Sequence, residues 1–290
     1  MPADSTPGDE GSEVGDPTDG PTAVVRRLTT FPVKSLDGCD RESVELVENG
    51  GLDGDREFAL FDSNGDYVNG KRERAVHRIR ADFDPATRRL RLAVPDREAA
   101  FDVDDDRAAM TAFLSEFFGY EVSLDQNRAG GFPDDTEASG PTVVSTATLR
   151  ETASWFDGIT VDGMRRRLRA NVELGARGDS ELPPFWEDRL FDRRGRVVEF
   201  SVGSVRFAGV NPCQRCVVPS RDPDTGDEYD GFRETFVRRR AETKPDWAES
   251  DWFDHDFRLM VNTRVPESSW GETLAVGDEV RVGAARPAAE

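Results

Sequence analysis

The sequence predicts a mainly β or α+β protein, with a β-barrel or mixed β architecture and few short helices. Three observations favour this class. Short segments with the pattern of strands recur along most of the 290-residue chain. Only a few segments show the apolar spacing of a helix. No unit of roughly 20–50 residues repeats, which argues against a solenoid.

The N-terminal part is predicted to begin with a tail and to continue as strands. Residues 1–22 hold almost nothing apolar, so we expect a disordered acidic tail there. Apolar and polar residues then alternate in short runs, and the turn residues at 62–66 join two of the runs as a hairpin. The expected strands are 24–28, 43–47, 56–61, 76–83 and 89–94.

One amphipathic helix is expected next. Its apolar residues recur at the spacing of a single helical face, and Asp106 and Gly119 suit its start and its end. We interpret the aromatic residues on this face as core. The face consists of Met110, Phe113, Leu114, Phe117 and Phe118.

The second half of the chain repeats this alternation of strands and helices. Residues 130–140 are polar and contain Gly and Pro, which indicates a loop or a domain junction. Ser145 suits the start of a helix that buries Leu149, Thr152, Ala153 and Phe156. The expected strands are 142–144, 197–201, 205–210, 257–261 and 279–282, with a short helix around residues 232–237.

Composition excludes several classes of function. The 36% hydrophobic content suffices for a sizeable core. The formal net charge is −20, which argues against binding to nucleic acid or to anionic membranes. No apolar run spans a bilayer, and we see no signal peptide, so a cytoplasmic location is expected.

The charged residues also have an unusual make-up. Only Lys34, Lys71 and Lys244 are lysines among 38 basic residues. An acidic, lysine-poor surface is typical of a salt-adapted (halophilic) protein. An ordinary acidic protein from a GC-rich genome would share this composition.

Two of the three cysteines, Cys213 and Cys216, stand in one short segment that ends in a turn sequence. Such a pair serves as a redox pair, as half of a zinc site or as a ligand set for a soft metal. No second pair or His-rich motif completes a zinc site, and the context is not that of a thioredoxin. A single thiolate on a metal needs only one cysteine, and the charge of Arg215 would favour the thiolate of Cys216. Two cysteines that only pack in the core remain the alternative.

A second candidate is the arginine cluster at residues 165–169. In a strand, Arg165, Arg167 and Arg169 would face one way, with Asn171 in register, and would make a good anion site. A solvated charged face is the alternative. Lys34 with Ser35, and Arg56 at the start of a strand, are further candidates to contact a phosphate.

Taken together, four motifs resemble the MOSC family, named after the C-terminal domain of molybdenum cofactor sulfurase, and within it the proteins similar to the mitochondrial amidoxime-reducing component. The resemblance covers about residues 23–283. The chain has Ala170 where the family usually has proline, and Phe257 only loosely matches a family aromatic residue. The motifs are 31–35 with 51–56 and 61–65, then 166–171, 213–226 and 275–280.

The resemblance implies an N-terminal MOSC β-barrel-like domain over residues 23–128, a MOSC β-barrel domain over 129–284 and a tail over 285–290. It also implies a molybdenum cofactor, with Cys216 as the catalytic residue and Mo ligand and Cys213 as the alternative ligand. Pyridoxal phosphate binding is a further property associated with the family. The residues implied to bind the cofactor are Lys34, Ser35, Arg56, Ser145, Thr146, Arg167, Arg169, Asn171, Gln214 and Arg215.

The implied function is that of a molybdenum-dependent oxidoreductase that reduces N-hydroxylated small molecules. Because the chain has no ferredoxin-like domain and no membrane anchor, we expect a separate electron donor of ferredoxin or cytochrome type, and no membrane or nucleic-acid partner. The alternatives are a carrier of molybdenum cofactor, a sulfur-transfer protein that uses the two cysteines, and a β-barrel that binds no metal.

Overall fold

The structure is a computed structural model that describes residues 21–248 and 254–288. The acidic tail predicted over residues 1–22 lies almost wholly outside these ranges. The described residues are mostly strands, with four α-helices, which confirms the mainly β or α+β class. The helices are α1 (Arg107–Phe118), α2 (Thr146–Ser154), α3 (Val161–Leu168) and α4 (Phe232–Thr243).

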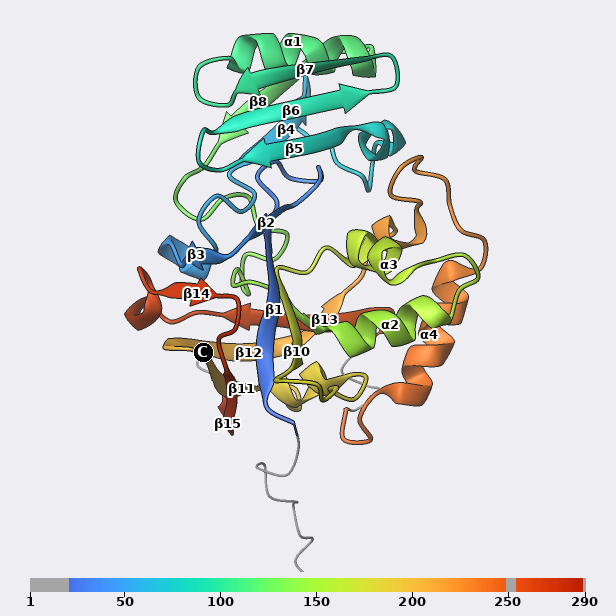
Figure 1. Ribbon diagram of the computed structural model, residues 1–290. Helices are drawn as coiled ribbons and strands as arrows, with labels where there is room; N and C mark the ends of the chain where they lie inside the picture. The colour runs from blue at the N-terminus through green and yellow to red at the C-terminus, as the bar shows by residue number, and fades with distance from the viewer. Residues whose placement is uncertain (1–20, 249–253, 289–290) are drawn as a thin grey trace, which may run out of the picture.

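Eight strands form one large mixed sheet in the order β15-β11-β12-β13-β9-β10-β1-β2. Neighbours are antiparallel except β9 and β10, which run parallel. In Figure 1 this sheet occupies the lower half of the molecule, with α2 and α4 beside it. The strands are β1 (Ala23–Thr30), β2 (Cys39–Arg41), β9 (Val143–Ser145), β10 (Val172–Ala176), β11 (Arg196–Val202), β12 (Val205–Gln214), β13 (Arg258–Arg264) and β15 (Val280–Pro287).

The first strand joins the last part of the chain. Along β1, Val25 pairs with Leu174 of β10. At the start of β1, Val24 forms an isolated bridge with Glu279, and the Val25 amide donates to the Asp278 carbonyl at 2.9 Å. The two sides of the sheet therefore meet at one isolated bridge, and no ladder in the described part of the chain closes them into a barrel.

A smaller β part lies above the large sheet (Figure 1). It consists of the meander β5 (Arg80–Asp84), β6 (Arg89–Val94) and β7 (Arg97–Asp102), covered by α1, and of the pair β4 (Phe58–Asp62) and β8 (Val122–Gln126). Its own core holds α1 through Met110 and Leu114. A third small sheet pairs β3 (Ser43–Glu45) with β14 (Thr273–Ala275).

The helices of the lower half pack through aromatic rings. Phe156, which follows α2, stacks on Phe232 of α4 with ring centroids 4.2 Å apart. Phe236 of α4 meets Phe257 edge to face. These rings form one buried cluster with Met164 and Leu168 of α3. Burial of such large apolar side chains is the main term that fixes the helices beside the sheet.

The caps of the helices are partly as predicted. Gly119 ends α1 with a φ of 77°, and the Ser145 hydroxyl accepts the Thr148 amide at the start of α2. Asp106 stands at the N-cap position of α1 as expected, but its carboxylate accepts the Asp102 amide and makes no capping bond to the helix.

Strand bounds also differ from the prediction at two places. The strand expected over 76–83 is wrong at its start, where a 3-10 helix covers Arg74–Arg78 before β5 begins. The last strand runs to Pro287 and so includes part of the tail expected over residues 285–290. None of the helices in the described part of the chain has the length and apolar composition of a membrane span.

A buried acid beside α2 makes stability depend on pH. Glu187 is fully buried, and Thr148 donates to its carboxylate at 2.9 Å. Burial, with the nearby charge of Asp188, raises the pKa of Glu187 from 4.5 to about 7. The folded state therefore holds this proton more tightly than the unfolded state. The stability linked to Glu187 is complete below pH 4.5 and is lost as the pH rises through about 7.

Glu187→Gln should remove this dependence. We expect the free energy of unfolding of the wild type to fall by about 3 kcal/mol more than that of the variant between pH 5 and pH 8. Urea unfolding at both pH values measures the difference. Parallel pH profiles for the two proteins would show that Glu187 is ionised in the folded state at neutral pH.

Candidate functional site

A cavity of about 360 Å³ lies where the upper β part meets the large sheet. Its walls come from segments that are far apart in the sequence. The upper part contributes residues around Arg56 and His77, and the lower part contributes residues around Arg169, Cys216 and Met260. A cavity of this size suits a small molecule or a cofactor.

The cavity is basic although the chain carries a net charge of −20. Eight lysine and arginine side chains line it against four aspartates, which favours an anionic ligand. The eight are Arg56, Lys71, Arg80, Arg166, Arg167, Arg169, Arg215 and Arg221, and the four are Asp37, Asp55, Asp134 and Asp135.

The condition for a shared arginine face, a strand over residues 165–171, does not hold. Thr160 caps α3 by accepting the Gly163 amide at 3.0 Å, and the helix runs to Leu168. Met164 and Leu168, four residues apart, bury one face of this helix. Arg169 then ends the helix in the left-handed conformation, with a φ of 57°. The arginines therefore leave the helix in different directions instead of sharing one face.

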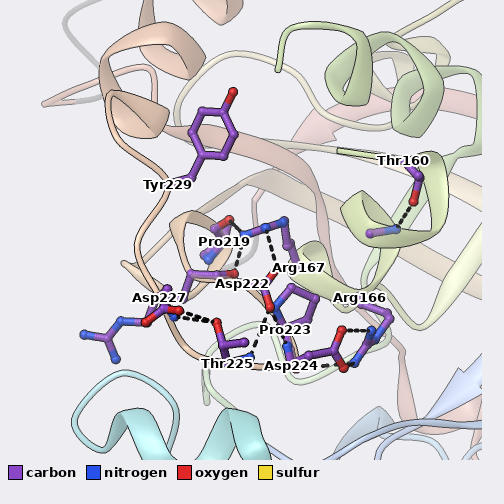
Figure 2. Close-up of polar contacts among 12 residues, drawn as sticks. Thr160, Arg166, Arg167, Pro219, Asp222, Pro223, Asp224, Thr225, Asp227 and Tyr229 are labelled. Atoms are coloured by element: carbon purple, nitrogen blue, oxygen red, sulfur yellow. Dashed lines mark hydrogen bonds and ion pairs between the residues drawn. The ribbon is translucent and has the colours of Figure 1, made fainter. Parts of the chain in front are cut away.

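Three of these arginines bind partners within the protein. Arg165 bonds to Glu173 at 2.6 Å. Arg166 holds both carboxylate oxygens of Asp224, at 2.7 and 2.9 Å (Figure 2). Arg167 is buried and donates to the carbonyls of Pro219 and Arg221. They fix the surroundings of the cavity and have little capacity left for a ligand.

The turn that follows the cysteines ties the two parts of the molecule together. Asp222 accepts the amides of Asp224 and Thr225, which shapes the turn (Figure 2). Asp224 then binds Arg80 of β5 at 2.9 Å as well as Arg166 of α3. One carboxylate thus joins the upper meander to the helix that carries the arginine cluster.

Strained backbone concentrates around the cavity. Among the described residues, seven non-glycine residues have a positive φ, and four of them line the cavity. Each such residue costs of the order of 1 kcal/mol or more and persists where the surroundings enforce it. Such positions cluster at functional sites. The four are Ser35 (75°), Arg56 (52°), Arg169 (57°) and Met260 (69°).

Arg169 differs from the other cavity arginines. Within the described ranges its guanidinium has no hydrogen-bond or ion-pair partner, and it stacks on the Phe31 ring at 4.1 Å. Burial, with the nearby charge of Arg56, lowers its pKa to about 10. A desolvated guanidinium without a carboxylate partner is suited to bind an anionic ligand.

Lys34, Arg56 and Asp134 form an ionic cluster beside Arg169. Lys34 is buried just behind the lining and donates to the Phe132 carbonyl at 2.9 Å and to Asp134. Arg56 pairs with Asp55 and lies 3.7 Å from Asp134. Partial loss of water alone would raise the pKa of Asp134, but the charges of Arg56 and Lys34 outweigh this and hold it at about 2.

No sequence signal singles out Asp134. It stands in the 130–140 segment, which reads as a plain Gly- and Pro-containing loop, and nothing in its sequence distinguishes it from Asp135. Only the folded contacts with Lys34 and Arg56 reveal its role.

Both cysteines of the pair line the cavity. Cys216 is exposed in the loop, whereas Cys213 is half-buried near the end of β12. The contact expected between Arg215 and Cys216 is replaced by another, because Arg215 donates to the Cys213 sulfur at 3.2 Å and to the Leu168 carbonyl at 2.9 Å. The basic side chain of Arg215 therefore contacts Cys213.

Two predicted cofactor contacts do not reach the cavity. Ser145 is fully buried at the start of α2, and the Thr146 hydroxyl donates to Glu173 at 2.8 Å. Neither residue lines the cavity, because both are used at the junction of α2 with β10.

Two further predicted residues, Asn171 and Gln214, lie at the wall with polar groups already engaged. Asn171 accepts the Thr142 amide and donates to the Thr29 carbonyl, which holds β10 against β1. Gln214 is exposed and contacts His255 and Arg258. The structure thus brings Ser35, Arg56, Arg167, Arg169, Asn171, Cys213, Gln214, Arg215 and Cys216 to one cavity.

The lining residues fit an anionic metal complex that brings most of its own ligands. No group of three or more His, Cys, Asp or Glu side chains in the described part of the chain could hold a bare metal ion. The exposed Cys216 thiol offers one soft ligand, and Arg169 offers an unpaired positive charge. A molybdenum cofactor would use both features, because its metal accepts a soft ligand and its tail is anionic.

Comparison with known proteins gives a match for the N-terminal part. Residues 22–126 match the family model of the MOSC N-terminal beta barrel domain, a segment that runs from just before β1 to the last residue of β8. Among solved structures, the YUAD protein from Bacillus subtilis is 14% identical, over 90% of this chain and 95% of that one, with a TM-score of 0.39. No curated protein matches the chain. The match identifies residues 22–126 as a MOSC N-terminal beta barrel domain and supports placing the chain with the MOSC-domain family.

Proposed function

We propose that the chain binds a molybdenum cofactor in this cavity and acts as an oxidoreductase that reduces N-hydroxylated small molecules. The observation that carries the proposal is the combination, in one basic cavity, of the exposed Cys216 thiol with the unpaired Arg169 guanidinium. The electrons would come from a separate donor protein of ferredoxin or cytochrome type. The association of MOSC domains with molybdenum cofactor supports the proposal.

The roles of the residues follow from their contacts. Cys216 would ligate molybdenum, and Arg169, with Arg56, would bind the anionic part of the cofactor. Arg215 would position the cysteine loop through Cys213 and the Leu168 carbonyl. When bound, the cofactor would supply two-electron redox chemistry at the metal.

The chain would also have to supply protons. Reduction of an N–OH group to N–H, with release of water, consumes two electrons and two protons. Asp37 lines the cavity, and burial raises the pKa of its carboxyl despite the amide of Ala81 and the charge of Arg166. Asp37 is therefore the cavity carboxyl best suited to hold a proton.

Metal and pterin analysis of the purified chain tests the proposal. We expect molybdenum and pterin in about equal amounts, and conversion of benzamidoxime to benzamidine with an artificial electron donor. Molybdenum should be bound together with pterin, because the described residues of the cavity offer too few ligands for a bare metal ion. A preparation from a cofactor-producing host that contains neither molybdenum nor pterin would refute the proposal.

A carrier of cofactor or sulfur is the second candidate. The contact of Arg215 with the Cys213 sulfur favours it, because sulfur transfer needs a reactive cysteine and this contact places a basic group on that sulfur. A protein that retains molybdenum but does not turn over, and that loses sulfur transfer in Cys213→Ser, would support the carrier over the reductase.

A further inference from the structure

Most of the positive charges in the cavity are already neutralised or engaged. Arg80 and Arg166 bind Asp224, while Arg167, Arg215 and Arg221 donate to backbone carbonyls. Among the lining cations of the described residues, only Lys71, which is exposed, and Arg169 lack an ion-pair or hydrogen-bond partner for the side chain. An anion that enters the cavity must therefore be bound around Arg169.

Two carboxylates, Asp55 and Asp134, pair with the cations beside Arg169, and they differ in how far they are exposed. Asp55 is 12% exposed on its side chain, accepts the Phe31 amide at 2.7 Å and pairs with Arg56, so it is fixed in place. Asp134 is 74% exposed and reaches Lys34 and Arg56 from the side of the solvent. The first carboxylate belongs to the wall, whereas the second can leave without disrupting the core.

The loop around Asp134 is built to hold this carboxylate and also to release it. The Phe132 amide bonds to the Arg56 carbonyl at 2.9 Å on one side. On the other side, Asp135 accepts the amides of Glu137 and Ala138 at 2.9 and 3.0 Å. Between these anchors, Asp134 makes its polar side-chain contacts within the described ranges with Lys34 and Arg56 alone.

We propose that Asp134 is a built-in counter-ion that occupies an anion subsite formed by Lys34, Arg56 and Arg169, and that the phosphate-like group of an incoming ligand displaces it. The proposal rests on the proposed function for the identity of that ligand. Asp134 keeps the buried Lys34 paired while the cavity is empty of anions, and its release on binding frees the 130–140 loop. During binding, the Asp134 carboxylate and the phosphate-like group of the ligand would then compete for the same three cations.

Binding of inorganic phosphate to the full chain tests the competition. Titration calorimetry at constant ionic strength, balanced with KCl, compares the wild type with Asp134→Asn. We expect phosphate to bind the variant about tenfold more tightly, because it no longer displaces a charged hydrogen-bond partner. Arg169→Gln in the Asp134→Asn background should abolish the gain.

Asp135→Asn is the matched control. It removes the same charge from the same loop and the same cavity, and its amide oxygen can still accept the Glu137 and Ala138 amides. We expect its phosphate affinity to stay within about twofold of the wild type. An equal gain in phosphate affinity in both variants would mean that only the overall charge matters, and this would overturn the proposal. No gain in phosphate affinity in Asp134→Asn would also overturn it.

Hydrogen exchange of the wild type keeps the test valid if Asp134→Asn folds poorly. Saturating phosphate should speed amide exchange in the 130–140 loop, whereas unchanged or slower exchange would contradict displacement. These measurements do not need molybdenum. If Asp134→Asn binds phosphate more tightly but the purified chain holds no cofactor, the counter-ion proposal stands and the proposed function is refuted. If the chain holds the cofactor but Asp134→Asn binds phosphate no more tightly than the wild type, the proposed function stands and the counter-ion proposal is refuted.

Discussion

Cys216→Ser is expected to reduce the rate of benzamidoxime reduction by more than about 100-fold, since even residues behind a metal ligand contribute about 10- to 100-fold. A serine hydroxyl is a poor ligand for a soft metal site at neutral pH. Cys216 is exposed in its loop, so the change should leave the fold intact. Activity, molybdenum content and the thermal unfolding midpoint are measured together on the same preparation.

The other two cysteines supply the controls. Cys39 lies in β2, is not among the lining residues of the cavity, and should tolerate serine with unchanged activity. Cys213→Ser removes the sulfur that Arg215 contacts, and should lower activity less than Cys216→Ser does. Full activity in Cys216→Ser would rule this cysteine out as the ligand. An equal loss in Cys39→Ser would show that the assay reports general damage.

The largest expected effect on stability comes from Arg240 in α4. Its guanidinium holds both carboxylate oxygens of Asp188 at 2.7 and 2.9 Å, and the two side chains are only 3% and 8% exposed. Arg240→Met would leave Asp188 buried without its cation, beside the buried Glu187. Breaking a buried pair in this way costs about 3–5 kcal/mol. Urea unfolding measures the loss in free energy of unfolding.

Arg239→Met in the same helix is the matched control. Arg239 pairs with Glu242 at 3.5 Å, and both side chains are about half exposed. The loss there should stay below about 1 kcal/mol. A similarly small loss for Arg240→Met would mean that Asp188 takes up a proton and relaxes without its partner. Replacing both Asp188 and Arg240 by apolar residues should restore part of the stability that Arg240→Met loses.

Local patterns in the sequence sufficed for many elements of the fold. The apolar face of α1, the glycine that ends it and the serine that starts α2 all act within a few residues, so the sequence alone could reveal them. The same holds for β11, β12 and β6, whose alternation reflects one buried face.

The errors arose where local signals were weak or contacts were distant. The charged run of α3 hides its helical period, because only Met164 and Leu168 mark the buried face. The sequence order put Arg215 beside Cys216, but the folded chain places its guanidinium on Cys213. The partners of Asp134 are Lys34 and Arg56, which stand 100 and 78 positions earlier, and no local pattern encodes such contacts.

The pairing of the first strand constrains when a ligand can enter during biosynthesis. Strands β4 to β8 and α1 lie within residues 58–126 and contact one another, so we expect this part to fold while the ribosome is still at work. Strand β1 must wait for β10 and for Glu279, which are synthesised after residues 58–126. Since the cavity has walls from both parts, it is complete only after the residues up to Asn262 have been synthesised. Any cofactor must therefore be acquired after the upper part has folded without it.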